Sequence, residues 1–217
     1  MWSFPYPTDG PDHTLGVMTS TASEQRQALA TALRGVTADA PTLCEGWAAE
    51  DLALHIVIRD SRPDLMVGPQ LPLVGDWASK ALENLRNTGY AQLVKRAEAG
   101  PPVFFPQSLP PLNDMMNTAE FYIHTEDVLR AQPDFDPSSP RVISAKLRKR
   151  LWGQGALMFP MAARGAKKRI TFVSPGYGSR TSGPASAPKL RIEGAPEELL
   201  LWAFGREEKA QVTLTEG

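Results

Sequence analysis

The stretch APTLCEGWAAEDLALHIVIRDSRPD, residues 40–64, contains the clearest helix signal in the chain and one of its three histidines. Acidic side chains at the start of the predicted helix, 48–59, suit the positive end of a helix dipole. Leu52 and Ile56 lie on one helical face and mark it as buried. His55 lies between them in the sequence, and an unpartnered imidazole on a buried face is costly. The sequence therefore predicts that His55 has a specific partner.

The spacing around His55 adds two further residues to this face. Trp47, Asp51 and His55 follow one another at intervals of four, which places them close to one side of a helix. Asp51 lies one turn before His55 and is predicted to accept a hydrogen bond from the imidazole, fixing its tautomer.

A second stretch, NTAEFYIHTEDVLRAQP at residues 117–133, lies in a long predicted helix and contains another histidine. Asn117, Glu120, His124 and Asp127 recur at intervals of three or four and form a polar stripe. One interpretation is that this stripe is the solvated face of an amphipathic helix and that the histidine of the first stretch is a packed core residue.

The other interpretation is a metal site, which the buried position of His55 favours. Two imidazoles and one carboxylate from two helices are a common way for helical bundles to bind metal, and His55, Glu120 and His124 supply this set. Three protein ligands leave a position open for water or substrate. The set suits Zn²⁺, and Fe²⁺ or Ni²⁺ would also fit. Asp127 is predicted either to hydrogen-bond to His124 or to be a fourth ligand.

The helical pattern ends near Arg164, and strand patterns follow it. Strands are predicted at 169–173, 189–193 and 210–215, with a helix at 197–204 before the last of them and a Gly/Ser/Pro-rich loop at 174–188. The predicted fold class is α+β, a helical bundle followed by a small C-terminal β-β-α-β module. The predicted division of the chain is a loose N-terminal extension at 1–17, the metal-binding bundle at 18–164 and the module at 165–217.

Composition limits the classes of function. The chain has 217 residues, with 23 Lys+Arg against 24 Asp+Glu, and the net charge of −1 argues against a nucleic-acid or membrane-surface partner. The N-terminus lacks the basic and apolar regions of a secretory signal, and no apolar run approaches the roughly 20 residues of a membrane span. We therefore expect a cytoplasmic protein. Met18 is a candidate natural start, so His13 is left out of the site.

The single cysteine, Cys44, cannot form an intramolecular disulfide. Cys44 precedes the helix of the first stretch and is predicted to be a small buried hydrophobic residue, with contact to the metal site as the less favoured alternative.

The two quoted stretches, together with EGAPEELLLWAFGR at residues 193–206, resemble the DinB-like metal-binding superfamily. The resemblance is strongest to actinobacterial proteins related to mycothiol-dependent maleylpyruvate isomerase, and it runs from about Thr19 to the C-terminus. It implies a DinB-like four-helix bundle with one divalent metal ion, and the ligand pattern of the family falls on His55, Glu120 and His124. In the isomerase branch a C-terminal arginine assists catalysis, and Arg206 occupies the matching position.

The resemblance implies a thiol-dependent S-transferase or isomerase that acts on a small electrophilic substrate, with mycothiol as the candidate thiol. A metal ion favours the thiolate form, which is the nucleophile. Arg206 and Asp127 are the candidate catalytic residues, although Arg206 could instead cap its own helix. The alternatives are a metal-dependent hydrolase, with Asp127 or Glu126 as the base for an activated water, and a metal-binding protein without catalysis. No HExxH sequence is present, which argues against a zincin peptidase.

Overall fold

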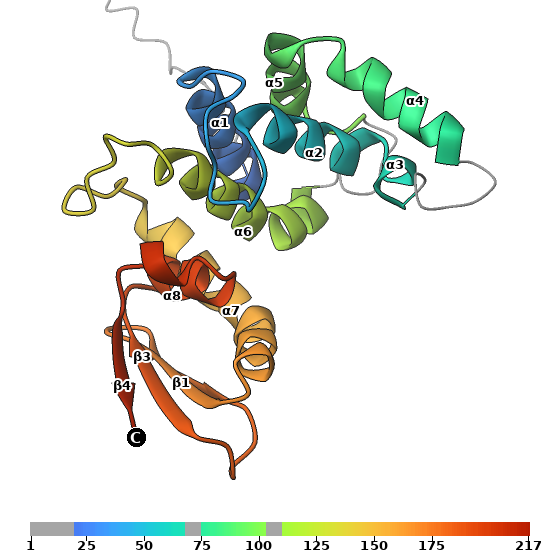
Figure 1. Cartoon of the computed structure of the whole chain (residues 1–217). Helices are drawn as coiled ribbons and strands as arrows, with labels where there is room; N and C mark the ends of the chain where they lie inside the picture. Colours follow the sequence, from blue (N-terminus) through green and yellow to red (C-terminus); the bar gives the residue numbers. More distant parts are fainter. Residues whose placement is uncertain (1–19, 68–74, 103–109) are drawn as a thin grey trace, which may run out of the picture.

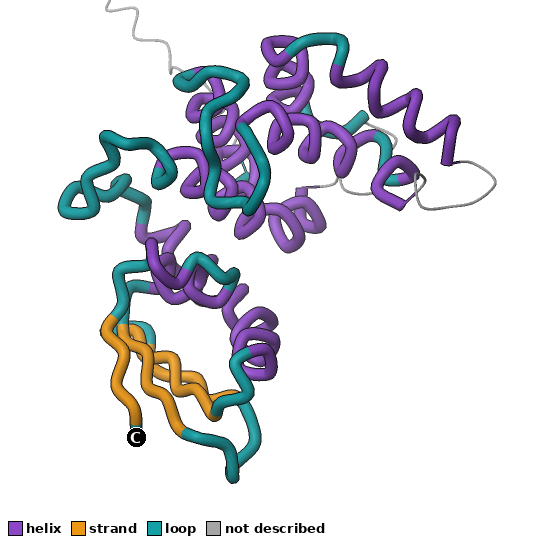
Figure 2. Tube along the Cα trace, viewed as in Figure 1, coloured by secondary structure: helices purple, strands orange, loops and turns teal. Residues whose placement is uncertain are grey.

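The computed structural model describes residues 20–67, 75–102 and 110–217, and the predictions for residues 1–17, for Met18 and for His13 lie outside them. Helices form one part of the molecule, and a four-stranded sheet with its covering helices forms the other (Figures 1 and 2). In chain order the elements are α1 (Thr21–Arg34), α2 (Ala49–Ser61), α3 (Asp64–Val67), α4 (Gly75–Arg86), α5 (Tyr90–Ala99), α6 (Pro110–Leu129), α7 (Ala145–Gly165), β1 (Arg169–Ser174), β2 (Gly178–Ser182), β3 (Lys189–Glu193), α8 (Pro196–Ala203), the 3₁₀ helix η3 (Glu207–Lys209) and β4 (Thr213–Glu216).

The helical part has a core built from the apolar faces of α1, α2, α5 and α6. A buried arginine joins these helices: Arg26 on α1 donates to Asp60 on α2 and to the carbonyl oxygen of Ala97 on α5, and its guanidinium lies 4.3 Å from the centre of the Phe121 ring on α6. The core and this link hold α2 and α6 together, and these are the helices that contain the two histidines. Within the described ranges, none of the helices is both long and apolar enough to cross a bilayer.

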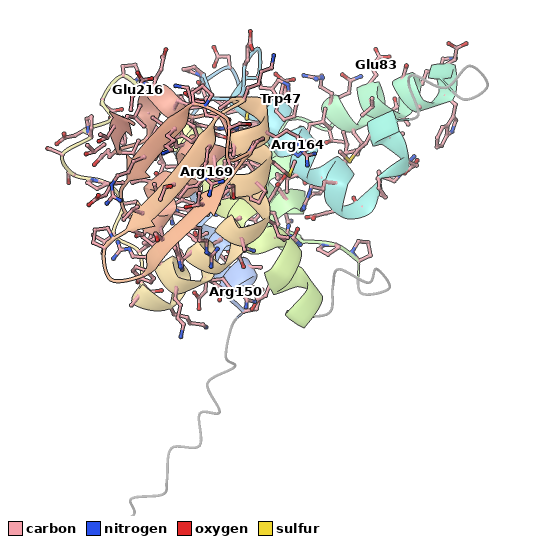
Figure 3. The ribbon with its side chains drawn as sticks, turned by 90° about the horizontal axis from the view of Figure 1, so that it is seen from below. Trp47, Glu83, Arg150, Arg164, Arg169 and Glu216 are labelled. Atoms are coloured by element: carbon pink, nitrogen blue, oxygen red, sulfur yellow. The ribbon has the colours of Figure 1, made fainter. Side chains whose placement is uncertain are left out.

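The C-terminal sheet has the strand order β2-β1-β3-β4. β1 and β3 are parallel, whereas β2 and β4 pair antiparallel with their neighbours at the two edges. Alternate residues of β1 and β3 point to one face, where Phe172 and Ile192 are buried against α7 and α8. Seen from below, the strands cross the front of the molecule, with Arg169 and Glu216 labelled on them (Figure 3). α7 packs mainly against α8 and the sheet, and thus shares its core with the C-terminal elements.

One strand was missed by the sequence analysis. β2 lies inside the stretch 174–188 that was predicted to be a loop, so the module is β-β-β-α-β. Its residues, GSRTS, include no large apolar side chain, and an edge strand without a buried face gives no alternating pattern. The turn before it contains Pro175 and Gly176, whose φ of 80° matches the position after proline in a type II turn.

Two helices start next to proline residues. α6 begins at Pro110, because proline is tolerated in a first helical turn, where N–H groups have no helical acceptor. The short helix α3 follows Pro63, and residues 68–74 lie outside the described ranges.

Two glycines of α7 allow a test of the packing between this helix and the sheet. A Cβ added at Gly155 would lie 2.5 Å from Cζ of Phe159, and that ring stacks on Phe172 with centroids 4.0 Å apart. In the described structure a Cβ at Gly153 would meet nothing within 4 Å. We expect Gly155→Ala to destabilise the protein by up to about 2 kcal/mol, since overpacking costs about 1–3 kcal/mol and the gain in helix propensity offsets about 1 kcal/mol of it.

The matched variant Gly153→Ala should be stabilising by about 0.5–1 kcal/mol, because it gains the same helix propensity without a clash. Urea unfolding followed by circular dichroism measures both values. Equal stabilisation by the two substitutions would show that the stacked rings of Phe159 and Phe172 can move away from the added methyl group at no cost.

Candidate metal centre

His55 on α2 meets Glu120 and His124 on α6. Oε1 of Glu120 lies 3.3 Å from Nε2 of His124 and 3.5 Å from Nε2 of His55. The two imidazole rings are edge to face, with centroids 5.5 Å apart. Around a tetrahedral zinc ion with bonds of about 2.0–2.1 Å, neighbouring donor atoms are about 3.3–3.4 Å apart. The separations between the carboxylate and the two imidazoles therefore fit a shared divalent cation.

The charges at this position also favour a cation. Burial raises the pKa of Glu120, but hydrogen bonds from His124 and His55, with the charges of His124 and Arg59, bring it well below its usual range. Burial lowers the pKa of His124, but Asp127, Cys44 and Glu120 raise it to about 11. Glu120 therefore stays ionised and attracts positive charge, which a divalent ion bound beside it would supply.

Asp127 contacts the opposite side of the His124 ring. Oδ2 of Asp127 lies 2.9 Å from Nδ1 of His124, whereas Glu120 faces Nε2. The Asp127 side chain is 0% exposed. Of the two roles predicted for Asp127, this geometry matches a hydrogen-bond partner of His124 rather than a ligand in the set with Glu120.

Arg206 reaches the same carboxylate from the C-terminal module. Its Nε donates to Oδ1 of Asp127 at 2.7 Å, and its Nη2 donates to Oδ2 at 2.6 Å. Its Nη1 also donates to the carbonyl oxygen of Phe204 at 2.6 Å. The Arg206 side chain therefore makes both predicted contacts, one with the candidate site and one with the end of its own helix.

Cys44 was predicted to be buried, but it is only partly buried against the core of the bundle, and its thiol also contacts the site. Sγ donates to Oδ2 of Asp127 at 3.2 Å and lies 3.3 Å from Nη2 of Arg206 and 3.9 Å from Nδ1 of His124. Contact with the site was the less favoured prediction for Cys44, because it depends on the loop before α2 crossing α6, where the N–H of Leu43 donates to the carbonyl oxygen of Asp127.

Cys44, His124 and Asp127 also form a second set of possible metal ligands that shares His124 with the first. The guanidinium of Arg206 already balances the charge of Asp127 there. A metal ion would have to displace this guanidinium or share the position with it, so the set with His55 and Glu120 is the better cation site.

Two sequence predictions need correction. Asp51 does not orient His55: it accepts a hydrogen bond from the N–H of Ala48 and pairs with Arg86 of α4 at 2.8 Å, because its side chain turns back toward the start of α2. The neighbour of His55 is the Trp47 ring, whose centroid is 5.1 Å away.

Glu126 was proposed as an alternative base, and the structure places it elsewhere. It lies on another face of α6 and forms buried ion pairs with Arg130 at 2.8 Å and Arg141 at 2.9 Å. Arg59 was not predicted to be near the site, yet its Nε lies 3.5 Å from Oε1 of Glu120, and it donates to Asn117. Its position one turn after His55 was the available sequence signal.

A pocket of about 440 Å³ opens onto the three candidate ligands. Its apolar lining comes from Leu43 and Trp47 in the loop before α2, Ile123 on α6 and Phe204 at the end of α8. Trp47 is 37% exposed and is labelled in Figure 3. The pocket therefore lies where the bundle meets the C-terminal module.

No family model matches the chain, and no curated protein matches its sequence. Two solved structures match over 90% of this chain and 90% of their own. One is the mycothiol-dependent maleylpyruvate isomerase, with 15% identity and a TM-score of 0.57, and the other is a histidine-to-alanine mutant of that enzyme, with 14% identity and a TM-score of 0.57. The predicted α+β, DinB-like fold is thereby confirmed.

Proposed function

We propose that this protein binds a divalent metal ion through His55, Glu120 and His124, with Zn²⁺ as the favoured metal. We also propose that it is a thiol-dependent transferase or isomerase. The principal support is the meeting of two imidazoles and one carboxylate beneath an open pocket. Three protein ligands and an open side are characteristic of catalytic rather than structural zinc. The shared fold makes mycothiol, on which the matched isomerase depends, the first thiol to test.

The bound metal would favour the thiolate of a small thiol over its protonated form. The residues of this chain shape the reaction around that sulfur. The apolar side chains of Leu43, Trp47, Ile123 and Phe204 keep water from the electrophile. The thiol releases its proton to solvent, and its sulfur adds to one carbon of an activated C=C bond, whose π electrons move toward the electron-withdrawing group. In a transfer, the carbanion takes up a proton and the adduct is retained. In an isomerisation, the adduct rotates about the former double bond, and the C–S bond breaks as the double bond forms again and the thiolate leaves.

The hydrolase alternative is less well supported. A metal-dependent hydrolase needs a free base near the water, but both oxygens of Asp127 accept hydrogen bonds from Arg206, and Oδ2 also contacts His124. Glu126 is held in its own ion pairs away from the pocket. Glu120 belongs to the candidate ligand set, and the other carboxylate in the pocket lining, that of Glu45, lies exposed in the loop before α2.

Replacing the metal with Co²⁺ tests the thiol step without knowledge of the substrate. Addition of mycothiol to the Co²⁺-loaded protein should produce a sulfur-to-cobalt charge-transfer absorption in the near ultraviolet. Turnover is then measured with the Zn²⁺-loaded protein, mycothiol and a panel of electrophiles that includes maleylpyruvate. We expect a rate at least about 100-fold above that without protein, as expected for positioned catalytic groups.

Arg150→Ala is a suitable control, since Arg150 lies on α7 and pairs with Asp114, away from this pocket. It should give the same cobalt–thiol spectrum as the wild type. Metal binding without any spectral change on addition of mycothiol, glutathione or cysteine would contradict the thiol chemistry and support a non-catalytic metal protein.

A further inference from the structure

A continuous chain of hydrogen bonds joins the C-terminal module to the candidate metal centre. Arg206 follows α8 and donates two hydrogen bonds to the Asp127 carboxylate, which in turn contacts Nδ1 of His124. Nε2 of the same imidazole faces Glu120. These residues therefore link an arginine of the module, through one buried carboxylate, to a ligand of the bundle.

The backbone of the module fixes where this arginine lies. The N–H of Arg206 donates to the carbonyl oxygen of Leu201, and Gly205 between them has a φ of 85°. This left-handed conformation is favourable for glycine and closes the end of α8. The guanidinium also donates to the carbonyl oxygen of Phe204. The backbone and the guanidinium of Arg206 are thus both anchored to the end of α8, and this fixes the guanidinium where it can bond Asp127.

The guanidinium of Arg206 restricts the orientation of this carboxylate. Asp127 is completely buried, and a planar guanidinium that bonds both carboxylate oxygens fixes the plane of the carboxylate. A carboxylate held in this way accepts the Nδ1 proton of His124 and leaves the Nε2 lone pair for a metal ion. Cys44 donates to the same carboxylate, so three groups surround it.

We infer that Arg206 is a positioning residue: it orients His124 through Asp127, so that the C-terminal module sets the metal affinity of a site whose ligands all lie in the bundle. The inference rests on the proposed metal site, and it assigns Arg206 a role that does not require contact with the substrate.

The direction in which Arg206→Met changes the metal affinity distinguishes a positioning role from a purely electrostatic one. Arg206→Met removes a positive charge near the metal position, so charge repulsion alone would make metal binding tighter. Loss of orientation makes it weaker, by roughly 10–100-fold for an outer partner of a metal ligand. Arg206→Lys keeps the charge but not the fork, and we expect a loss of about tenfold from it.

The measurement is the Zn²⁺ affinity, determined by competition with a chromophoric chelator, for Arg206→Met, Arg206→Lys, Asp127→Asn and the double variant of Arg206→Met with Asp127→Asn. Arg206 acts on His124 only through Asp127. The Zn²⁺ affinity of the double variant should therefore be no lower than that of the single variant with the lower affinity. Arg148→Met is the matched control, because Arg148 forms an equivalent paired contact with Glu197 of α8 that does not reach the site, and its affinity should equal that of the wild type.

Nuclear magnetic resonance supplies a readout that a general loss of structure would not give. In the Zn²⁺-loaded protein the Nδ1 proton of His124 should resonate far downfield, and it should move upfield in Arg206→Met while the rest of the spectrum stays dispersed. Unchanged or tighter Zn²⁺ binding in Arg206→Met would overturn the positioning role and leave the metal site intact. A wild-type protein that binds no divalent metal would overturn both.

Discussion

His124→Ala protein is expected to contain no bound zinc where the wild type is expected to contain about one equivalent, because the proposed site has three protein ligands and this change removes one of them. His55→Ala should give the same result, since Nε2 of His55 and Nε2 of His124 approach the same oxygen of Glu120. Either substitution should lower the affinity by more than the roughly 10–100-fold that an outer partner contributes. Metal content is measured by inductively coupled plasma mass spectrometry after dialysis against Zn²⁺ and then against metal-free buffer.

Asp51→Asn is the informative control for this experiment. The sequence placed Asp51 one turn from His55 as its orienting partner, whereas the structure pairs it with Arg86 and the start of α2. The variant should therefore retain its zinc. Zinc retained by His55→Ala and lost from Cys44→Ser would contradict the proposed ligand set and favour the set of Cys44, His124 and Asp127.

The bundle could be predicted from the sequence because its helices carry local signals. An acidic first turn, an apolar face and a closing proline placed the bounds of α2 to within about two residues, the usual uncertainty of helix ends. β2 could not be predicted, because an edge strand of Gly, Ser, Arg and Thr has no buried face to set a pattern. Its stability comes from pairing with β1, which is a tertiary property.

The same distinction applies to the candidate site. Intervals of three and four along one helix placed Glu120, His124 and Asp127 on one side of α6, and the structure agrees. The position of Cys44 depends on a loop that crosses α6, and no spacing within one element encodes it. Asp51 is the opposite case. Its spacing predicted a hydrogen bond to His55, but its carboxylate instead accepts from the N–H of Ala48 and pairs with Arg86.

A buried arginine outside the candidate site joins the two parts of the molecule. Arg130, at the end of α6, is 1% exposed and donates to Glu126 at 2.8 Å and to both oxygens of Glu198 on α8 at 2.6 and 2.9 Å. It also donates to the carbonyl oxygen of Lys209 in η3. Burial lowers the pKa of Arg130, but Glu198 and Glu126 raise it well above its usual value, so the guanidinium stays charged.

Arg130→Met is therefore expected to destabilise the protein by about 3–5 kcal/mol, the cost of leaving a buried charge without its partner. Glu126 keeps its pair with Arg141, so the uncompensated carboxylate is that of Glu198, where the N–H of Gln211 is the remaining donor. Since whole domains are stable by only about 5–15 kcal/mol, this single change should bring the protein close to unfolding at room temperature. Urea unfolding followed by circular dichroism and by tryptophan fluorescence measures the loss.

Two further variants separate the buried charge from the packing of the long side chain. The double variant Arg130→Met with Glu198→Met removes both charges and should recover part of the loss, because apolar replacements of a buried ion pair are often close to neutral. Arg191→Met breaks an exposed pair with Glu193 and should change the stability by less than about 1 kcal/mol. If the double variant is as unstable as the sum of its two single variants, the charges are not coupled, and Arg130 joins the bundle to the module by packing alone.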